Sequence, residues 1–139
     1  MILDDIVAHK WEELALRKAE RSLKTVKETA TSAPAPRGFG AALRTNGLSI
    51  VAEVKRKSPA KGVLNQTVVP ADQASAYARA GASAISVLTD QRFFDGDNAD
   101  LQAVRECVTR PVLRKDFTVD EYQVWEARSI GADAILLIV

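Results

Sequence analysis

Residues 81–88 read GASAISVL, and residues 131–138 repeat the pattern as GADAILLI. In both copies a glycine closes a helical stretch, and an apolar run begins three residues later. Glycine is favoured at the left-handed position that ends many helices. Strands without polar alternation are typical of a parallel sheet that is covered on both faces. The repeated pattern therefore predicts an α/β fold.

The segments around this repeat supply further strands and helices in alternation. The expected strands are Leu48–Val54, Ala84–Thr89, Pro111–Arg114 and Ala134–Val139. The expected helices between them are Ala71–Ala80, Ala99–Val108 and one that begins at Thr118 and ends near Gly131. Thr118 opens the run TVDE, which has the form of a capping box. This order predicts parallel strands joined by right-handed crossovers.

The residues before Leu48 form a different section. We expect one helix from Leu3 to about Thr31, ended by the prolines of the run SAPAPRG at 32–38. Its apolar face would carry Leu3, Val7, Trp11 and Leu14. A short helix over Phe39–Arg44 and a turn at Asn46-Gly47 would follow. The chain thus divides into a helical extension, 1–47, and a strand-containing part, 48–139.

The composition narrows the classes of function. The 139 residues carry 19 Lys and Arg against 18 Asp and Glu, which lacks the basic excess of a nucleic-acid binder. The single cysteine, Cys107, allows no internal disulfide. No apolar run reaches the ~18 residues of a membrane span, and Asp4 and Asp5 stand where a secretory signal would be basic. We expect a cytoplasmic protein without nucleic-acid or membrane partners.

The first expected strand ends in charged residues. Alternation along a strand places Val51, Glu53 and Lys55 on one face. Two charges at the end of that face indicate a polar site at the carboxyl end of the strand, where ligands of α/β folds bind. The alternative is an edge strand whose charges are solvated. The following loop carries three cations that either attract an anion or are simply solvated: Arg56, Lys57 and Lys61.

The third expected strand ends in a similar way. Leu113 and Lys115 share a face, so an apolar residue is followed by a lysine at the rim. A desolvated lysine near other cations can have a lowered pKa and act as a proton donor. The alternative is an ion pair of Lys115 or Arg114 with Asp116.

A few other residues have a possible role. Phe93 and Phe94 in the loop after the second strand suggest a pocket wall for a flat ligand, or a staple that holds the loop to the barrel. We expect Cys107 to fill a helix–sheet contact and His9 to lie on the surface. No phosphate-binding glycine loop or metal-ligand cluster occurs, so no cofactor or metal is expected.

Four motifs occur in a definite order along the chain. They are IVAEVKRKSP at 50–59, SVLTD at 86–90 with FDG at 94–96, PVLRKDF at 111–117, and GADAILLIV at 131–139. Together they resemble indole-3-glycerol-phosphate synthase, the lyase of tryptophan biosynthesis. The resemblance implies a (β/α)₈ TIM barrel, which needs roughly 200–250 residues. We therefore expect a truncated half-barrel of four parallel strands with an N-terminal helical extension.

The resemblance also implies a reaction. The family closes the ring of 1-(2-carboxyphenylamino)-1-deoxyribulose 5-phosphate with loss of carbon dioxide and water, and uses no cofactor or metal. It implies catalytic roles for Lys115 as general acid, Lys55 as contact to the anionic groups and Glu53 as the residue that organises both lysines. It implies substrate contacts for Ser58, Phe94 and Phe117.

Two departures limit this interpretation. The family's second catalytic glutamate follows strand four, and its phosphate-binding loops follow strands seven and eight, so we expect the chain alone to be inactive. A non-catalytic half-barrel that self-associates through its open sheet edges is the alternative. Another phosphosugar-handling barrel enzyme is disfavoured by the long N-terminal helix and the Lys-Asp-Phe motif at 115–117.

Overall fold

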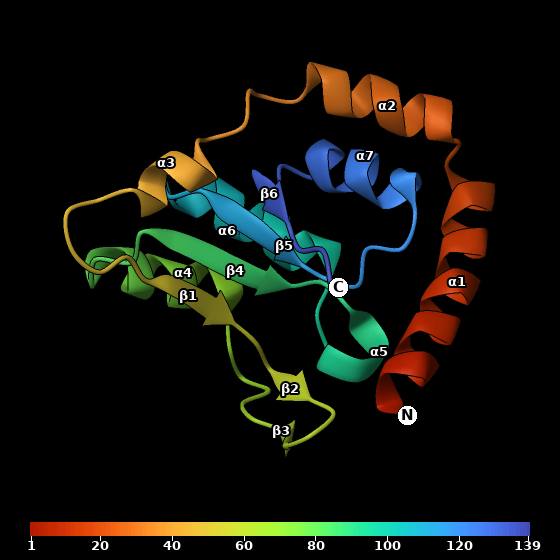
Figure 1. Cartoon of the computed structure of the whole chain (residues 1–139), viewed down its shortest axis with the longest axis horizontal. Coiled ribbons are helices and arrows are strands. Elements are labelled where there is room, and N and C mark those ends of the chain that lie inside the picture. The colour runs from red at the N-terminus through yellow and green to blue at the C-terminus, as the bar shows by residue number, and fades with distance from the viewer.

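Four parallel strands form the central sheet, and helices connect them (Figure 1). The computed structural model describes residues 1–139. The sheet strands are β1 (Val51–Val54), β4 (Ala84–Leu88), β5 (Val112–Lys115) and β6 (Ala134–Ile135), and a separate hairpin contains β2 (Lys57–Ser58) and β3 (Gly62–Val63). The helices are α1 (Ile2–Glu20), α2 (Leu23–Ser32), α3 (Phe39–Leu43), α4 (Pro70–Arg79), α5 (Gln91–Phe94), α6 (Asn98–Cys107) and α7 (Glu121–Ser129).

The strands lie in the order β1-β4-β5-β6, and every neighbouring pair is parallel. The order never reverses, which is the arrangement of a barrel sheet and not of a doubly wound one. In register, Glu53 lies opposite Ser86, and Ser86 lies opposite Leu113. The expected α/β class and the four parallel strands are confirmed.

Helices α4, α6 and α7 pack on one face of the sheet and enclose the main core (Figure 1). β4 is buried along its whole length, as its uninterrupted apolar sequence predicts. Ile85, Leu101 and Val112 are completely buried between the sheet and these helices. No helix of the protein is both long and apolar enough to cross a membrane.

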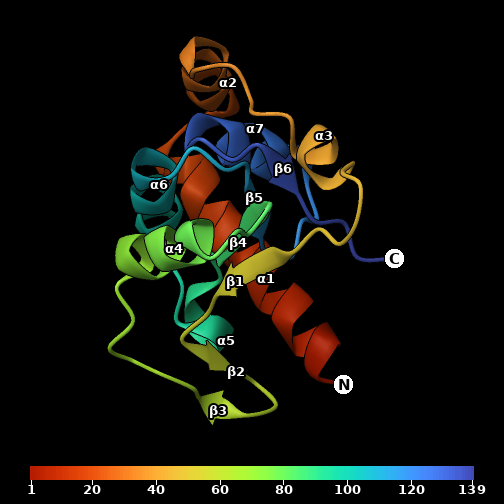
Figure 2. The same ribbon diagram turned by 90° about the vertical axis from the view of Figure 1, so that its left-hand side faces the viewer.

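The N-terminal section differs from its prediction. The single helix expected to Thr31 is two helices, because Ser22 adopts an extended conformation and its side chain accepts the Thr25 amide at 3.2 Å. A serine hydroxyl in this position satisfies one of the amides that every helix start leaves unpaired. The break allows α2 to lie beside α7 (Figure 2), where Val26 packs with Leu14 and Tyr122.

The buried face of α1 matches the expected one only in part. Leu14 is buried as expected, but Leu3 and Trp11 are 40% and 48% exposed, and Ile6 and Lys10 are buried instead. Apolar spacing alone could not select Lys10, since it assigns a lysine to solvent. In the folded chain Lys10 has carboxylate partners from other elements, which allow its burial.

Several boundaries and contacts need correction. Helix α7 is capped by Asp120 and not by Thr118, because the Asp120 carboxylate accepts the Tyr122 amide at 2.8 Å. The fourth strand pairs only at Ala134 and Ile135 instead of over 134–139. The first strand begins at Val51, not at Leu48. Cys107 does not fill a helix–sheet contact: it is exposed, and its Sγ lies 3.4 Å from the Ala71 oxygen of α4.

Candidate active site

Charged side chains converge at the carboxyl edge of the sheet. Lys115 at the end of β5 donates to Glu53 Oε2 at 3.0 Å, and Lys55 just beyond β1 approaches Glu53 Oε1 at 3.1 Å. Parallel strands bring their carboxyl ends to one edge, so the three residues meet although β4 separates β1 from β5. The structure therefore brings together the charged residues that end the first and the third expected strands.

The Glu53 carboxylate is held in its ionised form. Burial would raise the pKa of Glu53, but hydrogen bonds and charge from Lys115 and Lys55 outweigh it and lower the pKa below its ordinary value of 4.5. The side chains of Glu53, Lys55 and Lys115 are 26%, 33% and 36% exposed, so a ligand can reach them. An ammonium that is held by one carboxylate and open to a ligand can donate a proton or bind an anion.

An apolar cleft adjoins this charged group. Its volume is about 700 Å³, and Lys55 and Ser58 line it together with Phe94 and Phe117. The rings of Phe94 and Phe117 lie 6.0 Å apart at 37° to each other. A pocket with apolar walls and a few polar groups is the usual form of a small-molecule site. All six residues selected from the sequence thus contribute to the charged group or to the cleft beside it.

Helix α1 contributes a wall that the sequence did not reveal. Ile2, Leu3 and Ile6 line the cleft together with the two phenylalanines. Nothing in the local sequence links these residues to strand ends far along the chain.

The two adjacent aromatic residues have different roles. Phe94 lies beside Phe117 in the lining of the cleft, whereas Phe93 packs edge-on against His9 of α1 at 5.9 Å. The loop is therefore stapled to the N-terminal helix and not to the barrel, and His9 is partly buried by that contact. Gly96 ends the loop where a Cβ would lie 2.2 Å from the Leu88 carbonyl oxygen, so only glycine fits there.

The basic loop after β1 is largely occupied by protein contacts. Arg56 forms a two-pronged pair with the Asp100 carboxylate, and Lys57 donates to the Arg92 carbonyl at 3.2 Å. Arg56 is therefore not free to attract an anion, while Lys61 stays exposed.

The alternative in which Lys115 forms an ion pair with Asp116 is wrong, because Lys115 pairs with Glu53. Arg114 lies 3.8 Å from Asp116 but only 2.7 Å from Glu126, so its main partner is on α7.

Two polar contacts to Glu53 were not anticipated. Ser86 donates its hydroxyl to Glu53 Oε2 at 3.1 Å, and Tyr77 donates to the Glu53 carbonyl at 3.1 Å. Ser86 is the only polar residue in the buried run AISVL of β4, and this isolated hydroxyl was the available signal.

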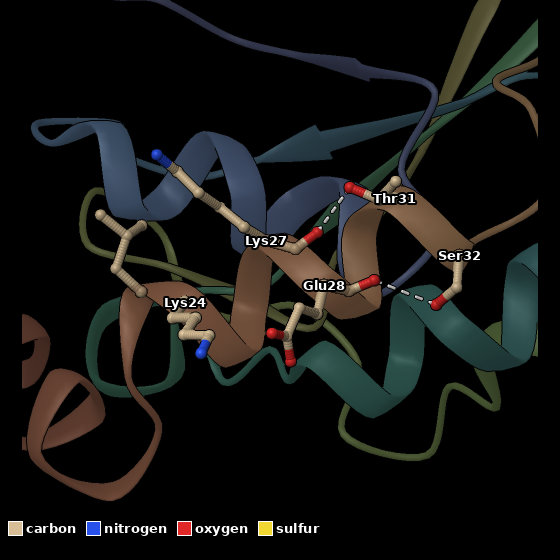
Figure 3. Close-up of a pocket in the computed structure, with 6 residues that line it drawn as sticks. Lys24, Lys27, Glu28, Thr31 and Ser32 are labelled. Atoms are coloured by element: carbon tan, nitrogen blue, oxygen red, sulfur yellow. Dashed lines mark hydrogen bonds between the residues drawn. The ribbon is translucent and has the colours of Figure 1, made fainter.

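A second large hollow, of about 640 Å³, lies on the outside of α2 (Figure 3). All of its lining residues come from that one helix. The Thr31 and Ser32 hydroxyls donate to carbonyls of their own helix, those of Lys27 and Glu28. Binding sites gather polar groups from several elements, so this surface is not a candidate site. Nowhere in the chain do three His, Cys, Asp or Glu side chains form a group that could hold a metal ion.

Comparisons with a family model and with curated proteins point to the same family. The family model for indole-3-glycerol phosphate synthase matches residues 3–139. The indole-3-glycerol phosphate synthase of Paenarthrobacter aurescens is 52% identical over an alignment of 143 positions, which covers 99% of this chain and 53% of the relative. That of Mycolicibacterium gilvum is 53% identical over 138 residues, with 99% and 51% covered. The chain spans about half the length of the curated relatives it matches.

Proposed function

Since the chain belongs to the indole-3-glycerol phosphate synthase family, we propose that its Glu53–Lys55–Lys115 group takes part in that lyase reaction. In this reaction 1-(2-carboxyphenylamino)-1-deoxyribulose 5-phosphate closes its second ring and loses carbon dioxide and water. The observation that carries the proposal is the single carboxylate held between two lysines at the mouth of a phenylalanine-lined cleft.

Lys115 is the proposed general acid. Ring closure places negative charge on the former carbonyl oxygen, and a protonated amine beside it can donate its proton as the new carbon–carbon bond forms. The Glu53 carboxylate accepts a hydrogen bond from the Lys115 ammonium at 3.0 Å and so orients it beside the cleft.

The remaining residues bind the substrate in this proposal. The benzene ring lies against Phe94 and Phe117, whose faces supply apolar contact. Lys55 and Ser58 line the same cleft and supply a charge and a hydroxyl for the substrate's anionic groups. The ligand is thus a phosphorylated aromatic amino sugar.

The proposal extends to the cellular compartment of the protein and to nucleic acid as a partner. The substrate's charges prevent it from crossing an apolar membrane, so we assign the protein to the cytoplasm. With 19 basic and 18 acidic residues, the chain has no charge excess suited to nucleic acid.

The test is a complementation assay. The 139-residue chain is assayed for indole-3-glycerol phosphate alone, and after mixing with a separately produced second half of the Paenarthrobacter aurescens enzyme. We expect no product from the chain alone, because it spans about half the length of its relatives, and product from the assembled mixture. A mixture that assembles by light scattering but forms no product contradicts the proposal.

A second candidate function, a self-associating half-barrel without catalysis, is favoured by one observation. Ile50, which precedes β1, and Leu137 and Ile138, which follow β6, are 60%, 66% and 50% exposed. Apolar residues gathered along sheet edges are typical of association surfaces.

A further inference from the structure

Lys10 of α1 is completely buried, and three carboxylates surround its ammonium group. Its Nζ lies 2.7 Å from Glu13 Oε2, 2.9 Å from Asp90 Oδ2 and 3.0 Å from Asp116 Oδ1. Asp90 and Asp116 are buried as well. None of these four residues has a part in the proposed chemistry.

The arrangement is a set of ion pairs and not an aligned hydrogen-bond network. Lys10 Nζ, Glu13 Oε2 and Asp90 Oδ2 have no hydrogen-bond partner of good geometry. Burial would lower the pKa of Lys10, but the carboxylates of Asp116, Glu13 and Asp90 outweigh it and raise the pKa, so the amine stays charged. Buried ion pairs contribute little net stability compared with apolar packing, and fixing one geometry is a better-supported role for them.

The other contacts of the two aspartates lead to the cleft. Asp90 Oδ1 accepts the Phe93 amide at 2.8 Å and so begins α5, the helix that carries Phe94. Asp116 Oδ1 accepts the Phe117 amide at 2.7 Å. The Lys10 ammonium therefore contacts both aspartates. One of them caps the helix that carries Phe94, and the other accepts the backbone amide of Phe117.

Lys10 is also part of the helix that supplies aliphatic side chains to the cleft. It lies one helical turn from Ile6, which lines the cleft together with Ile2 and Leu3. One side chain thus links the aromatic wall, formed by the loops after β4 and β5, to the aliphatic wall, formed by α1.

We propose that Lys10 is a positioning residue that keeps Phe94 beside Phe117 and holds both rings in place relative to helix α1. Without the ammonium, two buried carboxylates that now touch one nitrogen would repel each other and move their loops apart. The identity of the ligand in the cleft rests on the proposed function, but the positioning does not.

The experiment uses the full 139-residue chain with Lys10→Met, which has a similar volume and no charge. Lys18→Met is the matched control, because Lys18 is on the same helix and pairs with Asp120 at 3.0 Å away from the cleft. Two readouts are taken: the nuclear Overhauser contact between the Phe94 and Phe117 rings, and the affinity for 2-aminobenzoate by fluorescence titration. We expect Lys10→Met to lose the ring contact and at least tenfold in affinity, and Lys18→Met to keep both.

Lys10→Met removes the ammonium that contacts the buried carboxylates of Asp90 and Asp116 and can unfold the chain. Asp90→Asn is therefore the second variant, since it keeps an oxygen for the Phe93 amide but removes one charge. We expect a folded chain whose ring contact is weakened through movement of Phe94 alone. An unchanged ring contact in either folded variant overturns the proposal.

Chemical rescue separates positioning from general loss of packing. In a Cys107→Ser background, Lys10→Cys is alkylated with 2-bromoethylamine in denaturant and refolded, which restores an ammonium of nearly the same reach. Recovery of the ring contact and of 2-aminobenzoate affinity supports the proposal, and a refolded chain without recovery overturns it. Absence of synthase activity in the complementation assay would affect only the proposed function, because neither readout requires turnover.

Discussion

Glu53 accepts three donors with one carboxylate, and this single residue organises the candidate site. Oε1 faces Lys55, while Oε2 receives both Lys115 and the Ser86 hydroxyl. Charge-assisted hydrogen bonds of this kind are among the strong ones in proteins. The two lysines are thereby held near each other despite their like charge, which is the arrangement that a substrate with several anionic groups requires.

Lys115→Ala tests the assignment of the general acid. In the assembled enzyme we expect turnover to fall about 10²–10⁴-fold, the usual contribution of a positioned acid, with a smaller change in KM. Steady-state kinetics of product formation measure both. Lys24→Ala on the outer side of α2 is the control, and near-normal turnover in Lys115→Ala would remove Lys115 from the mechanism.

Asp116 gives a pH dependence with a definite sign. Burial would raise its pKa, but Arg114, Lys10 and Thr89 outweigh burial and lower the pKa below its ordinary value of 3.8. A lowered pKa stabilises the folded chain fully above pH 3.8, and this contribution is lost as the pH falls through the folded value.

We therefore expect the free energy of unfolding to decrease as the pH is lowered below about 4. Asp116→Asn should be less stable at neutral pH and show a smaller decrease on acidification. Urea unfolding at several pH values provides the measurement, and equal slopes for the two chains would contradict the stated cause.

Helix α7 shows how a sequence motif for a helix start can be assigned to the wrong residue. Both Thr118 and Asp120 are residues that favour helix starts. The structure selects Asp120, whose carboxylate accepts the Tyr122 amide while Gln123 reaches back to the Asp120 amide. Gln123 also donates to the Phe117 carbonyl at 2.8 Å, which connects the start of α7 to the cleft wall.

Paired substitutions distinguish the two caps. Asp120→Ala should lower the free energy of unfolding by about 0.5–2 kcal/mol, the range for the loss of an N-cap. Thr118→Ala should change it by less than about 0.5 kcal/mol, as for a surface position without a special contact. Urea denaturation of both chains decides, and a larger loss at Thr118 would assign the cap as the sequence motif did.

For the whole molecule, the decisive feature is the exposed apolar segment that follows the outer strand β6. Leu137 and Ile138 are 66% and 50% exposed, and no charged residue interrupts the run Ala134–Val139. Burial of apolar surface contributes about 25 cal/mol per Å², so even an interface at the lower end of stable sizes favours association. A two-fold axis would pair two such edges in opposite directions.

We expect a dimer or larger oligomer at micromolar concentration, with Ile135, Leu137 or Val139 in the interface. Light scattering should give at least twice the 15.1 kDa mass of the chain. Leu137→Lys should shift the protein toward the monomer, whereas Leu16→Lys on α1 should not. A soluble monomer at this concentration would show that the exposed edge does not recruit a second copy.

Local patterns in the sequence are sufficient to predict the succession of strands along the chain, their parallel sheet and the charged residues at its carboxyl edge. These follow from short-range rules: the alternation of side chains along a strand put Glu53 and Lys115 at strand ends, and parallel strands bring such ends together. The motifs then pointed to the same family that the comparisons identify.

Only the tertiary structure decided the burial of Lys10, the break at Ser22 and the contribution of α1 to the cleft. A lysine in a helix is assigned to solvent by any local rule, since burial of a charge is costly without partners. Its partners, Asp90 and Asp116, lie far along the chain and reach Lys10 only when the loops after β4 and β5 are folded. The physical reason is that the cost of a buried charge is set by its neighbours in space.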